Sequence, residues 1–218
     1  MTWQEIHHLD QLLTLEINSW HSFITDPMWV FFSQKLEWAP MYAGIIALLI
    51  WKLGWKRGLI ILAGALLTFG FCDQFSNLIK HAVGRIRPLN DEFMISQGLH
   101  VLEHGGGYSF FSAHAANSFG LAFSTFIGMK RCLIGMPGAK ASQTSPNPDS
   151  QTATFMMPKW LKAYGCWIFF WAFMVAISRI FVGKHYLGDV IVGSIVGSLA
   201  GYCFARLCSF LATRFIKQ

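Results

Sequence analysis

Long apolar runs separated by short polar stretches dominate the chain, and this pattern is typical of membrane-spanning helices. A crossing needs about 20 predominantly apolar residues. Runs that approach or reach this length cover residues 38–53, 59–80, 112–128, 160–177 and 189–211. Trp38, Trp51 and Trp55 lie near the ends of the first run, where the aromatic belt of a membrane protein is expected. The pattern predicts an all-α fold, a polytopic membrane helix bundle with about five transmembrane helices; six spans are the alternative.

A different pattern precedes these runs. Over residues 3–20, apolar positions recur at spacings of three and four: Ile6, Leu9, Leu13, Ile17 and Trp20. This spacing predicts an amphipathic helix that lies in the membrane interface rather than crossing it. Thr25-Asp26-Pro27 is a helix-start signal, but the segment that follows meets Pro40 too early to span a membrane alone. We therefore expect residues 1–37 to form interfacial helices, the second of them partly inserted or interfacial, and no cleavable signal peptide.

Two further stretches have distinctive compositions. Residues 134–158 are rich in Pro, Ser, Thr and Gly, which predicts a flexible loop. Gly193, Gly197 and Gly201 recur every four residues in the last apolar run, a spacing that lets another helix approach closely. No internal repeat is visible, so residues 1–218 are expected to form a single membrane-embedded domain.

Composition agrees with a membrane protein, and the charge distribution orients it. The chain is 54% hydrophobic and only 13% charged, whereas soluble domains carry about 25% charged residues. Its net charge of +6 would suit nucleic acid, but most Lys and Arg residues gather at the 52–57 turn, the 130–162 loop and the C-terminus. Asp149 is the only acidic residue on that side of the predicted bundle. The positive-inside rule places this side, with the 134–158 loop, in the cytoplasm, and no nucleic-acid partner is expected.

Three polar clusters lie at the opposite, outer end of the predicted bundle. They cover residues 80–88 at the end of the second run, 110–114 at the start of the third, and 178–189 between the fourth and fifth. Ionisable residues at the membrane edge are functional-site candidates because placing them there is costly. The alternating direction of the spans brings the three clusters to one face of the bundle, although they are far apart in sequence.

One group of residues in these clusters suits an anion. Lys80, Arg87 and Arg179 supply three cations, of which arginine offers phosphate a planar fork and lysine a point charge. Ser112 and the backbone N–H groups after it open a predicted helix, and a helix N-terminus favours anions. Taken alone, Lys80 and Arg87 would be interpreted as snorkelling anchors at the end of a span.

A second group suits nucleophilic and acid–base chemistry. His114 and His185 supply two imidazoles, and Asp189 follows His185 by four residues, close enough to hold one ring nitrogen. Taken singly, this His–Asp pair would indicate a capped helix or half a metal site. Asp73 suits two roles equally, positioning Lys80 or satisfying an interhelical hydrogen bond. Three further histidines are interpreted as loop or interface residues, the last two with head-group contact as an alternative: His81, His100 and His104.

Together, the three clusters resemble the signature of the type-2 phosphatidate phosphatase superfamily. The matching motifs are Lys80-x6-Arg87-Pro88, Ser112-x-His114 and Ser178-Arg179-x5-His185-x3-Asp189. The resemblance covers the second to fifth spans, with order and spacing intact. The second motif departs from the usual Pro-Ser-Gly-His, because Phe111 stands for the proline and Ala113 for the glycine. Alanine keeps its backbone N–H, so this departure affects loop geometry more than activity.

The resemblance implies a role for each matching residue. His185 would attack phosphorus and form a phosphohistidine, Asp189 would orient His185, and His114 would protonate the leaving oxygen and then activate water. The residues that would bind the phosphoryl oxygens are Lys80, Arg87, Ser112 and Arg179. The family needs no metal, and no cofactor is expected here. Arg85 and Lys184 are extra positive charges near the site that would suit a second phosphate.

Function and location follow from the same resemblance. A membrane lipid phosphatase of a bacterial inner (plasma) membrane is expected, with a lipid phosphate and the bilayer as partners and the site facing the periplasm or exterior. Family analogy favours undecaprenyl pyrophosphate as substrate, and lipid A, phosphatidate and phosphatidylglycerophosphate are the alternatives. A transporter is disfavoured because the charges lie at one edge without an inverted repeat, and a vanadate haloperoxidase because of the spans. Neither pattern nor resemblance predicts an oligomeric state.

Overall fold

The computed structural model describes residues 2–136, 141–142 and 154–215. In chain order, its helices are α1 (Trp3–Ser19), α2 (Asp26–Ser33), η1 (Leu36–Trp38), α3 (Ala39–Leu53), α4 (Trp55–Val83), η2 (Pro88–Asn90), α5 (Glu92–Ser96), α6 (Ala113–Ile134), α7 (Lys159–Phe181) and α8 (Leu187–Phe215). Between α6 and α7, the two-residue strands β1 (Ala141–Ser142) and β2 (Thr154–Phe155) pair antiparallel. Most of the loop predicted at 134–158 lies outside the described residues.

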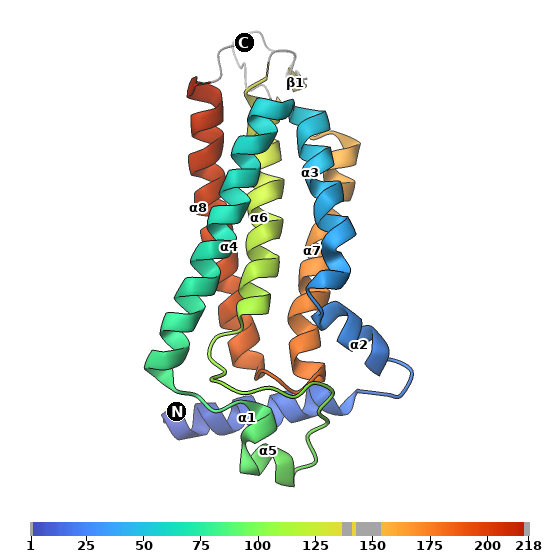
Figure 1. Ribbon diagram of the computed structural model, residues 1–218, viewed down its shortest axis with the longest axis vertical. Helices are drawn as coiled ribbons and strands as arrows, with labels where there is room; N and C mark the ends of the chain where they lie inside the picture. Colours follow the sequence, from blue (N-terminus) through green and yellow to red (C-terminus); the bar gives the residue numbers. More distant parts are fainter. Residues whose placement is uncertain (1, 137–140, 143–153, 216–218) are drawn as a thin grey trace.

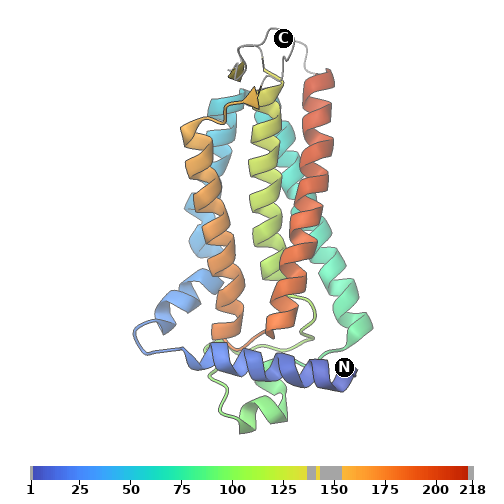
Figure 2. The same cartoon turned by 180° about the vertical axis from the view of Figure 1, so that it is seen from behind.

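The long helices run side by side and form one bundle (Figures 1 and 2). The predicted apolar runs correspond to α3, α4, α6, α7 and α8, so the prediction of an all-α membrane helix bundle is confirmed. Within the described residues, four helical segments are long and apolar enough to cross a membrane; they include α3, α4, α7 and most of α8. The remaining long helix, α6, lies in the middle of the bundle against α4, α7 and α8. Its buried positions carry small and hydroxylated residues such as Ala116, Ser118 and Thr125, which suit a helix surrounded by other helices.

A glycine ridge on α8 determines how closely α8 approaches α6. A Cβ atom added at Gly197 would lie 2.0 Å from the carbonyl oxygen of Ala116, and one added at Gly193 would lie 2.5 Å from that of Ser112. No side chain fits at these distances, so the absence of a Cβ is what allows the two backbones to meet. The close contact predicted from the glycine spacing is present, and it joins the ends of α6 and α8 that carry the polar clusters.

The amphipathic helix predicted at residues 3–20 is present as α1, which lies across one end of the bundle (Figures 1 and 2). Thr2 and Glu5 begin it with a capping box, in which each side chain accepts a hydrogen bond from the other residue's backbone N–H. Its polar side is turned toward the protein, where Gln11, Thr14 and Asn18 are buried. Its apolar side is exposed, and that side carries Ile6, Leu9, Leu13 and Trp20. Contact of this exposed side with the membrane interface stays a prediction.

Polar contacts explain why α1 packs with its polar side inward. The Asn18 side chain donates to the carbonyl oxygen of Ile180 at 3.0 Å, in the last turn of α7, where helix carbonyls lack intrahelical partners. The Thr14 hydroxyl accepts a hydrogen bond from the backbone N–H of Leu187 at 2.9 Å, at the first residue of α8. The α1 side chains therefore satisfy the unpaired backbone groups that α7 and α8 present at this end of the bundle.

α2 packs against the end of α7 that lies closest to α1. The rings of Trp29 and Phe181 stack with their centroids 4.0 Å apart. This contact holds the last residue of α2, Ser33, beside α7, where Ser33 is buried. The two N-terminal helices thus cover the same end of the bundle that carries the predicted polar clusters.

Candidate active site

The structure brings the three polar clusters together at the end of the bundle that α1 covers. The backbone N–H of Ser112 donates to the backbone carbonyl oxygen of Asp189 at 3.0 Å, which joins the second and third clusters. Arg85 of the first cluster donates from Nη1 to Asp189 Oδ1 at 2.8 Å. Residues more than 100 positions apart in sequence therefore share one site around the Asp189 carboxylate.

His185 and Asp189 form a buried pair at the start of α8. His185 lies in the short loop between α7 and α8, and Asp189 lies in the first turn of α8. The distance from His185 Nδ1 to Asp189 Oδ2 is 3.4 Å, and the two residues are only 2% and 0% exposed. Asp189 Oδ2 also accepts hydrogen bonds from the Ser109 hydroxyl and from the backbone N–H of Tyr186, the latter at 3.1 Å. With Nδ1 facing the carboxylate, the other ring nitrogen of His185, Nε2, points away from Asp189.

The surroundings of His185 keep its imidazole neutral. Burial lowers the pKa of His185 to about 4, because the charged imidazolium loses its hydration. Asp189 opposes this effect through its hydrogen bond and its charge, whereas the positive charges of Arg179 and Arg87 reinforce it. His185 is therefore unprotonated at neutral pH, which is the form in which a ring nitrogen has a lone pair available for attack.

The predicted phosphate-binding cations lie around this pair. Arg179 is only 2% exposed, and its Nη1 donates to the hydroxyl of Ser33. The charge of Lys80 interacts with those of Arg87 and Arg179 and with that of Asp189, which places the three cations in one cluster. Among the described residues, the Nε–H groups of Arg87 and Arg179 are buried without a hydrogen-bond partner. Buried donors of this kind are what an anion entering the site would satisfy.

A cavity of about 270 Å³ opens beside Arg179, and of the site residues predicted from the sequence only Arg179 and His114 line it. His114, the second residue of α6, lies on its wall and interacts electrostatically with both Arg179 and His185. The other residues that line the cavity are Ser33, Gln34, Lys35, Leu36, Glu103, Arg179 and Lys184. Ser112 begins α6 as predicted, and its hydroxyl accepts a hydrogen bond from the Ala115 N–H at 3.4 Å. The cavity thus gives a ligand from the α2 side access to His114 and to the Arg179 guanidinium.

Arg85 and Lys184 are paired within the protein rather than left for a second phosphate. Arg85 Nη2 donates to Asp10 Oδ2 at 2.7 Å, in addition to the Nη1 contact with Asp189, and its guanidinium lies 3.8 Å from the ring centroid of Tyr186. Lys184 Nζ donates to Glu103 Oε2 at 2.7 Å. The geometry therefore does not support the expected second-phosphate role, because both side chains already neutralise carboxylates.

Glu103 is an anion at the wall of the cavity. Burial alone would raise the pKa of this carboxyl, but the hydrogen bond from Lys184 and the nearby charge of Arg179 hold the pKa below its ordinary value. Its Oε2 lies 3.8 Å from Arg179 Nη1. A carboxylate thus lies beside the Arg179 guanidinium, one of the cations assigned to the phosphate.

Asp10, Glu103 and Ser109 are site residues that the sequence did not indicate. Asp10 is on the polar side of α1 and accepts hydrogen bonds from Arg85 and, at 2.7 Å, from the backbone N–H of Gly188. Ser109 and Glu103 lie in the loop between α5 and α6, outside the three motifs. An acidic residue on an amphipathic helix is usually solvated, so only the packing of α1 on the site reveals the role of Asp10.

Comparisons with known proteins show the family and the fold that this chain shares. Residues 58–212 match the family model described as the PAP2 superfamily. A relative from Bacteroides thetaiotaomicron named lipid A 4'-phosphatase is 32% identical over 209 residues, covering 94% of this chain and 80% of the relative. A Porphyromonas gingivalis protein of the same name is 25% identical over 213 residues, covering 97% and 78%. The crystal structure of a transmembrane PAP2-type phosphatidylglycerolphosphate phosphatase from Bacillus subtilis is similar in fold, with a TM-score of 0.67 over 97% of this chain and 90% of that chain, at 17% identity.

Proposed function

Given that this chain belongs to the PAP2 superfamily and is a membrane lipid phosphatase, we propose that it hydrolyses a phosphate monoester of a glycolipid of the lipid A class and releases phosphate. The observation that carries the chemistry is the buried His185–Asp189 pair, which lies beside two guanidinium Nε–H groups without partners among the described residues. The substrate class rests on the two relatives named lipid A 4'-phosphatase, which match nearly the whole chain. They support the lipid A alternative better than undecaprenyl pyrophosphate, the substrate favoured from the sequence.

The proposed reaction proceeds in two steps. In the first, His185 Nε2 attacks phosphorus and the bond from phosphorus to the lipid oxygen breaks. His114, which takes up a proton when the negatively charged phosphate binds, donates that proton to the lipid oxygen. In the second, His114 takes a proton from water as the water oxygen attacks phosphorus, and the nitrogen–phosphorus bond breaks. Free phosphate leaves, and both imidazoles return to their starting states. Asp189 orients His185 throughout and stabilises its positive charge in the intermediate.

The cations stabilise the charge that develops on the phosphoryl oxygens. Arg87 and Arg179 would supply their buried Nε–H groups, and Lys80 would add a point charge. Ser112 would contribute from the N-terminus of α6, where backbone N–H groups favour an anion. Arg85 and Lys184 are paired with carboxylates, so the structure lends no support to a diphosphate over a monophosphate.

Charge asymmetry supports an outward-facing site in the inner membrane. The basic residues of the described helices at the end opposite the site include Lys52, Lys56, Arg57, Lys130, Arg131, Lys159 and Lys162. The positive-inside rule assigns that end to the cytoplasm. The site would then face the periplasm or exterior and reach lipid head groups of the outer leaflet of that membrane.

Phosphate release by the purified full-length protein tests this proposal. Lipid A, undecaprenyl pyrophosphate, phosphatidylglycerophosphate and phosphatidate are presented in parallel in identical detergent micelles, with His185→Ala as the inactive control. We expect lipid A to be the preferred substrate, and mass spectrometry of the product to show loss of one phosphate. Preference for undecaprenyl pyrophosphate or a glycerolipid would overturn the substrate class. Release by His185→Ala at the wild-type rate would overturn the mechanism.

A further inference from the structure

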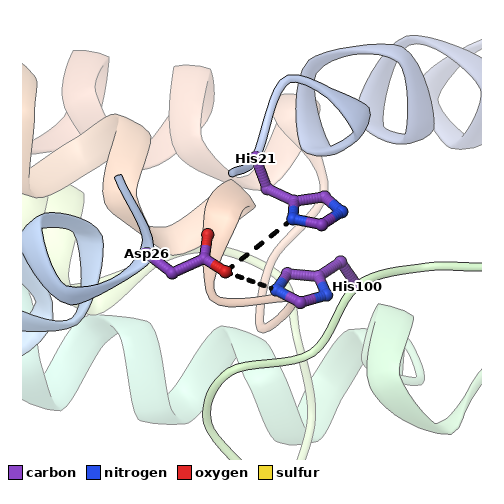
Figure 3. Close-up of side chains that lie close together, drawn as sticks. All are labelled: His21, Asp26 and His100. Carbon is purple, nitrogen blue, oxygen red and sulfur yellow. Dashed lines mark hydrogen bonds and ion pairs between the residues drawn. The ribbon is translucent and has the colours of Figure 1, made fainter. Parts of the chain in front are cut away.

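A second cluster of ionisable side chains lies outside the phosphate site, where three separate segments meet (Figure 3). His21 follows the end of α1, Asp26 is the first residue of α2, and His100 lies in the loop after α5. Asp26 Oδ2 is 2.9 Å from His100 Nε2 and 3.8 Å from His21 Nδ1. All three ligand-type atoms lie within 4.8 Å of one another.

Two polar atoms of this cluster have no hydrogen-bond partner among the described residues. Among the described residues, His21 Nδ1 and Asp26 Oδ1 are buried atoms without a hydrogen-bond partner. The rings of His21 and His100 stack with centroids 3.6 Å apart, and both turn a nitrogen toward the same carboxylate oxygen (Figure 3). Leaving buried polar atoms unpaired costs free energy, and a bound ion is one partner that would satisfy them.

We propose that His21, Asp26 and His100 bind a divalent transition metal ion, with Zn²⁺ as the best fit. Two imidazole nitrogens and one carboxylate oxygen form a common ligand set for Zn²⁺. In a tetrahedral site with bonds of about 2.0–2.1 Å, neighbouring ligand atoms lie about 3.3 Å apart. The distances of 2.9 and 3.8 Å bracket that value. Water would complete the coordination, because the two histidine side chains are 35% and 31% exposed.

Metal binding requires a small rearrangement. The two rings are parallel to within 5°, so an ion between their planes needs each ring to tilt toward it. Rotation about the last side-chain torsion of histidine is soft, and both rings are partly exposed, so this tilt displaces no packed core. The ion would replace the ring stacking and the single hydrogen bond to Asp26 with three coordinate bonds.

The proposed ion would fix the loop that carries Glu103 against the N-terminal helices. The backbone N–H of His100 donates to Asn18 at 2.8 Å, so the loop is already attached to α1 at this residue. Three residues later, Glu103 contacts Lys184 at the wall of the cavity beside Arg179. None of the three proposed ligands lines that cavity. The ion would therefore act as a structural clamp beside the phosphate site rather than as a participant in hydrolysis.

Binding of Co²⁺ to the metal-stripped full-length protein in detergent tests this site, because Co²⁺ reports its coordination through visible absorption. We expect one equivalent to bind with a tetrahedral spectrum, Zn²⁺ to displace it, and either ion to raise the unfolding temperature. His21→Ala and His100→Ala should abolish this binding, whereas His104→Ala, an exposed histidine of the same loop, should retain it. Binding unchanged in His21→Ala and His100→Ala, or no binding by the wild type, would overturn the proposal.

A gain of signal separates coordination from a general structural role of the histidines. His100→Cys keeps a metal ligand and should add a thiolate-to-Co²⁺ charge-transfer band that neither the wild type nor His104→Cys shows. The test stays decisive even if the alanine variants misfold, because a folded His100→Cys protein without the charge-transfer band would contradict the proposed site.

Discussion

Replacement of Arg85 by glutamine should slow turnover without weakening substrate binding. Carboxylates engage both terminal nitrogens of Arg85: Nη1 donates to Asp189 Oδ1 at 2.8 Å, and Nη2 donates to Asp10 Oδ2 at 2.7 Å. Asp189 is fully buried and in turn contacts His185, so the loss of Arg85 removes one of the donors that orient the carboxylate. Arg85 is therefore a positioning residue. Its replacement should slow the reaction because Asp189 then orients the His185 imidazole less well.

The expected magnitude follows from the lost contact. A hydrogen bond to a charged group contributes about 1.5–3 kcal/mol. At about 1.36 kcal/mol for each factor of ten in rate, kcat should fall about 10- to 150-fold in Arg85→Gln. Arg85→Lys keeps the positive charge, but a single ammonium group cannot replace the two guanidinium contacts with Asp189 and Asp10. The kcat of this variant should therefore lie between those of the wild type and Arg85→Gln. KM should change little in either variant, because the Nη groups of Arg85 are engaged by Asp189 and Asp10 and are not assigned to the phosphate.

Steady-state phosphate release from micelles of the preferred lipid, with thermal unfolding measured in parallel, checks this prediction. Arg206→Gln is the matched control, since Arg206 is exposed near the opposite end of α8 and loses the same charge. A folded Arg85→Gln protein with the wild-type kcat would refute the positioning role. A large rise in KM with unchanged kcat would instead indicate that Arg85 binds substrate, as the second-phosphate hypothesis requires.

The remaining predictions concern the nucleophile, the acid, the metal requirement and the orientation. His185→Ala should lower phosphate release by at least about three orders of magnitude, and His114→Ala should slow it severely; substantial turnover by His185→Ala would contradict the assigned nucleophile. Because burial lowers the pKa of His185 to about 4 from 6.5, the unfolded chain binds more protons between these pH values. Wild-type stability relative to His185→Gln, measured as unfolding temperature, should therefore decrease as the pH falls through this range; a constant difference would argue against a buried neutral imidazole. Phosphate release should persist in excess EDTA below the unfolding temperature; a loss of turnover that a divalent ion restores even in His21→Ala, which lacks the proposed clamp, would show that the chemistry needs a metal. A single cysteine placed in residues 95–105 should react with an impermeant reagent in intact cells, and labelling only after lysis would reverse the proposed orientation.

The bundle and much of the site could be predicted from the sequence because both leave local signals. Apolar runs of membrane length predicted the long helices, and the run at residues 112–128 predicted α6, although α6 is not among the four segments apolar enough to cross a membrane. The spacing from His185 to Asp189 is one turn of helix, so their contact follows from local geometry. The alternating direction of successive helices and the order of the three motifs then predicted that the polar clusters lie at the same end of the bundle.

The contacts made by the N-terminal helices could not be predicted in the same way. A pattern of apolar and polar positions identifies an amphipathic helix, but it does not state which side faces the protein. In α1 the polar side packs inward, so Asp10 reaches Arg85, its partner 75 residues away. Likewise, His100 was interpreted as a loop or head-group residue because nothing in the sequence connects it to Asp26, 74 residues earlier.

The glycine ridge of α8 has a consequence for attempts to stabilise this protein by design. Replacing glycine by alanine inside a helix commonly gains about 0.5–1 kcal/mol, so all helical glycines look like equal targets. At Gly44 and Gly70 an added methyl group would meet no neighbouring atom within 4 Å, whereas at Gly197 it would collide with the backbone of α6. A methyl group there would wedge α8 away from α6 and so separate the helix that begins beside the nucleophile from the helix that carries the acid. Thermostabilising libraries should therefore sample the first two positions and leave the ridge unchanged, since it sets the separation of the two helices that bring the catalytic groups together.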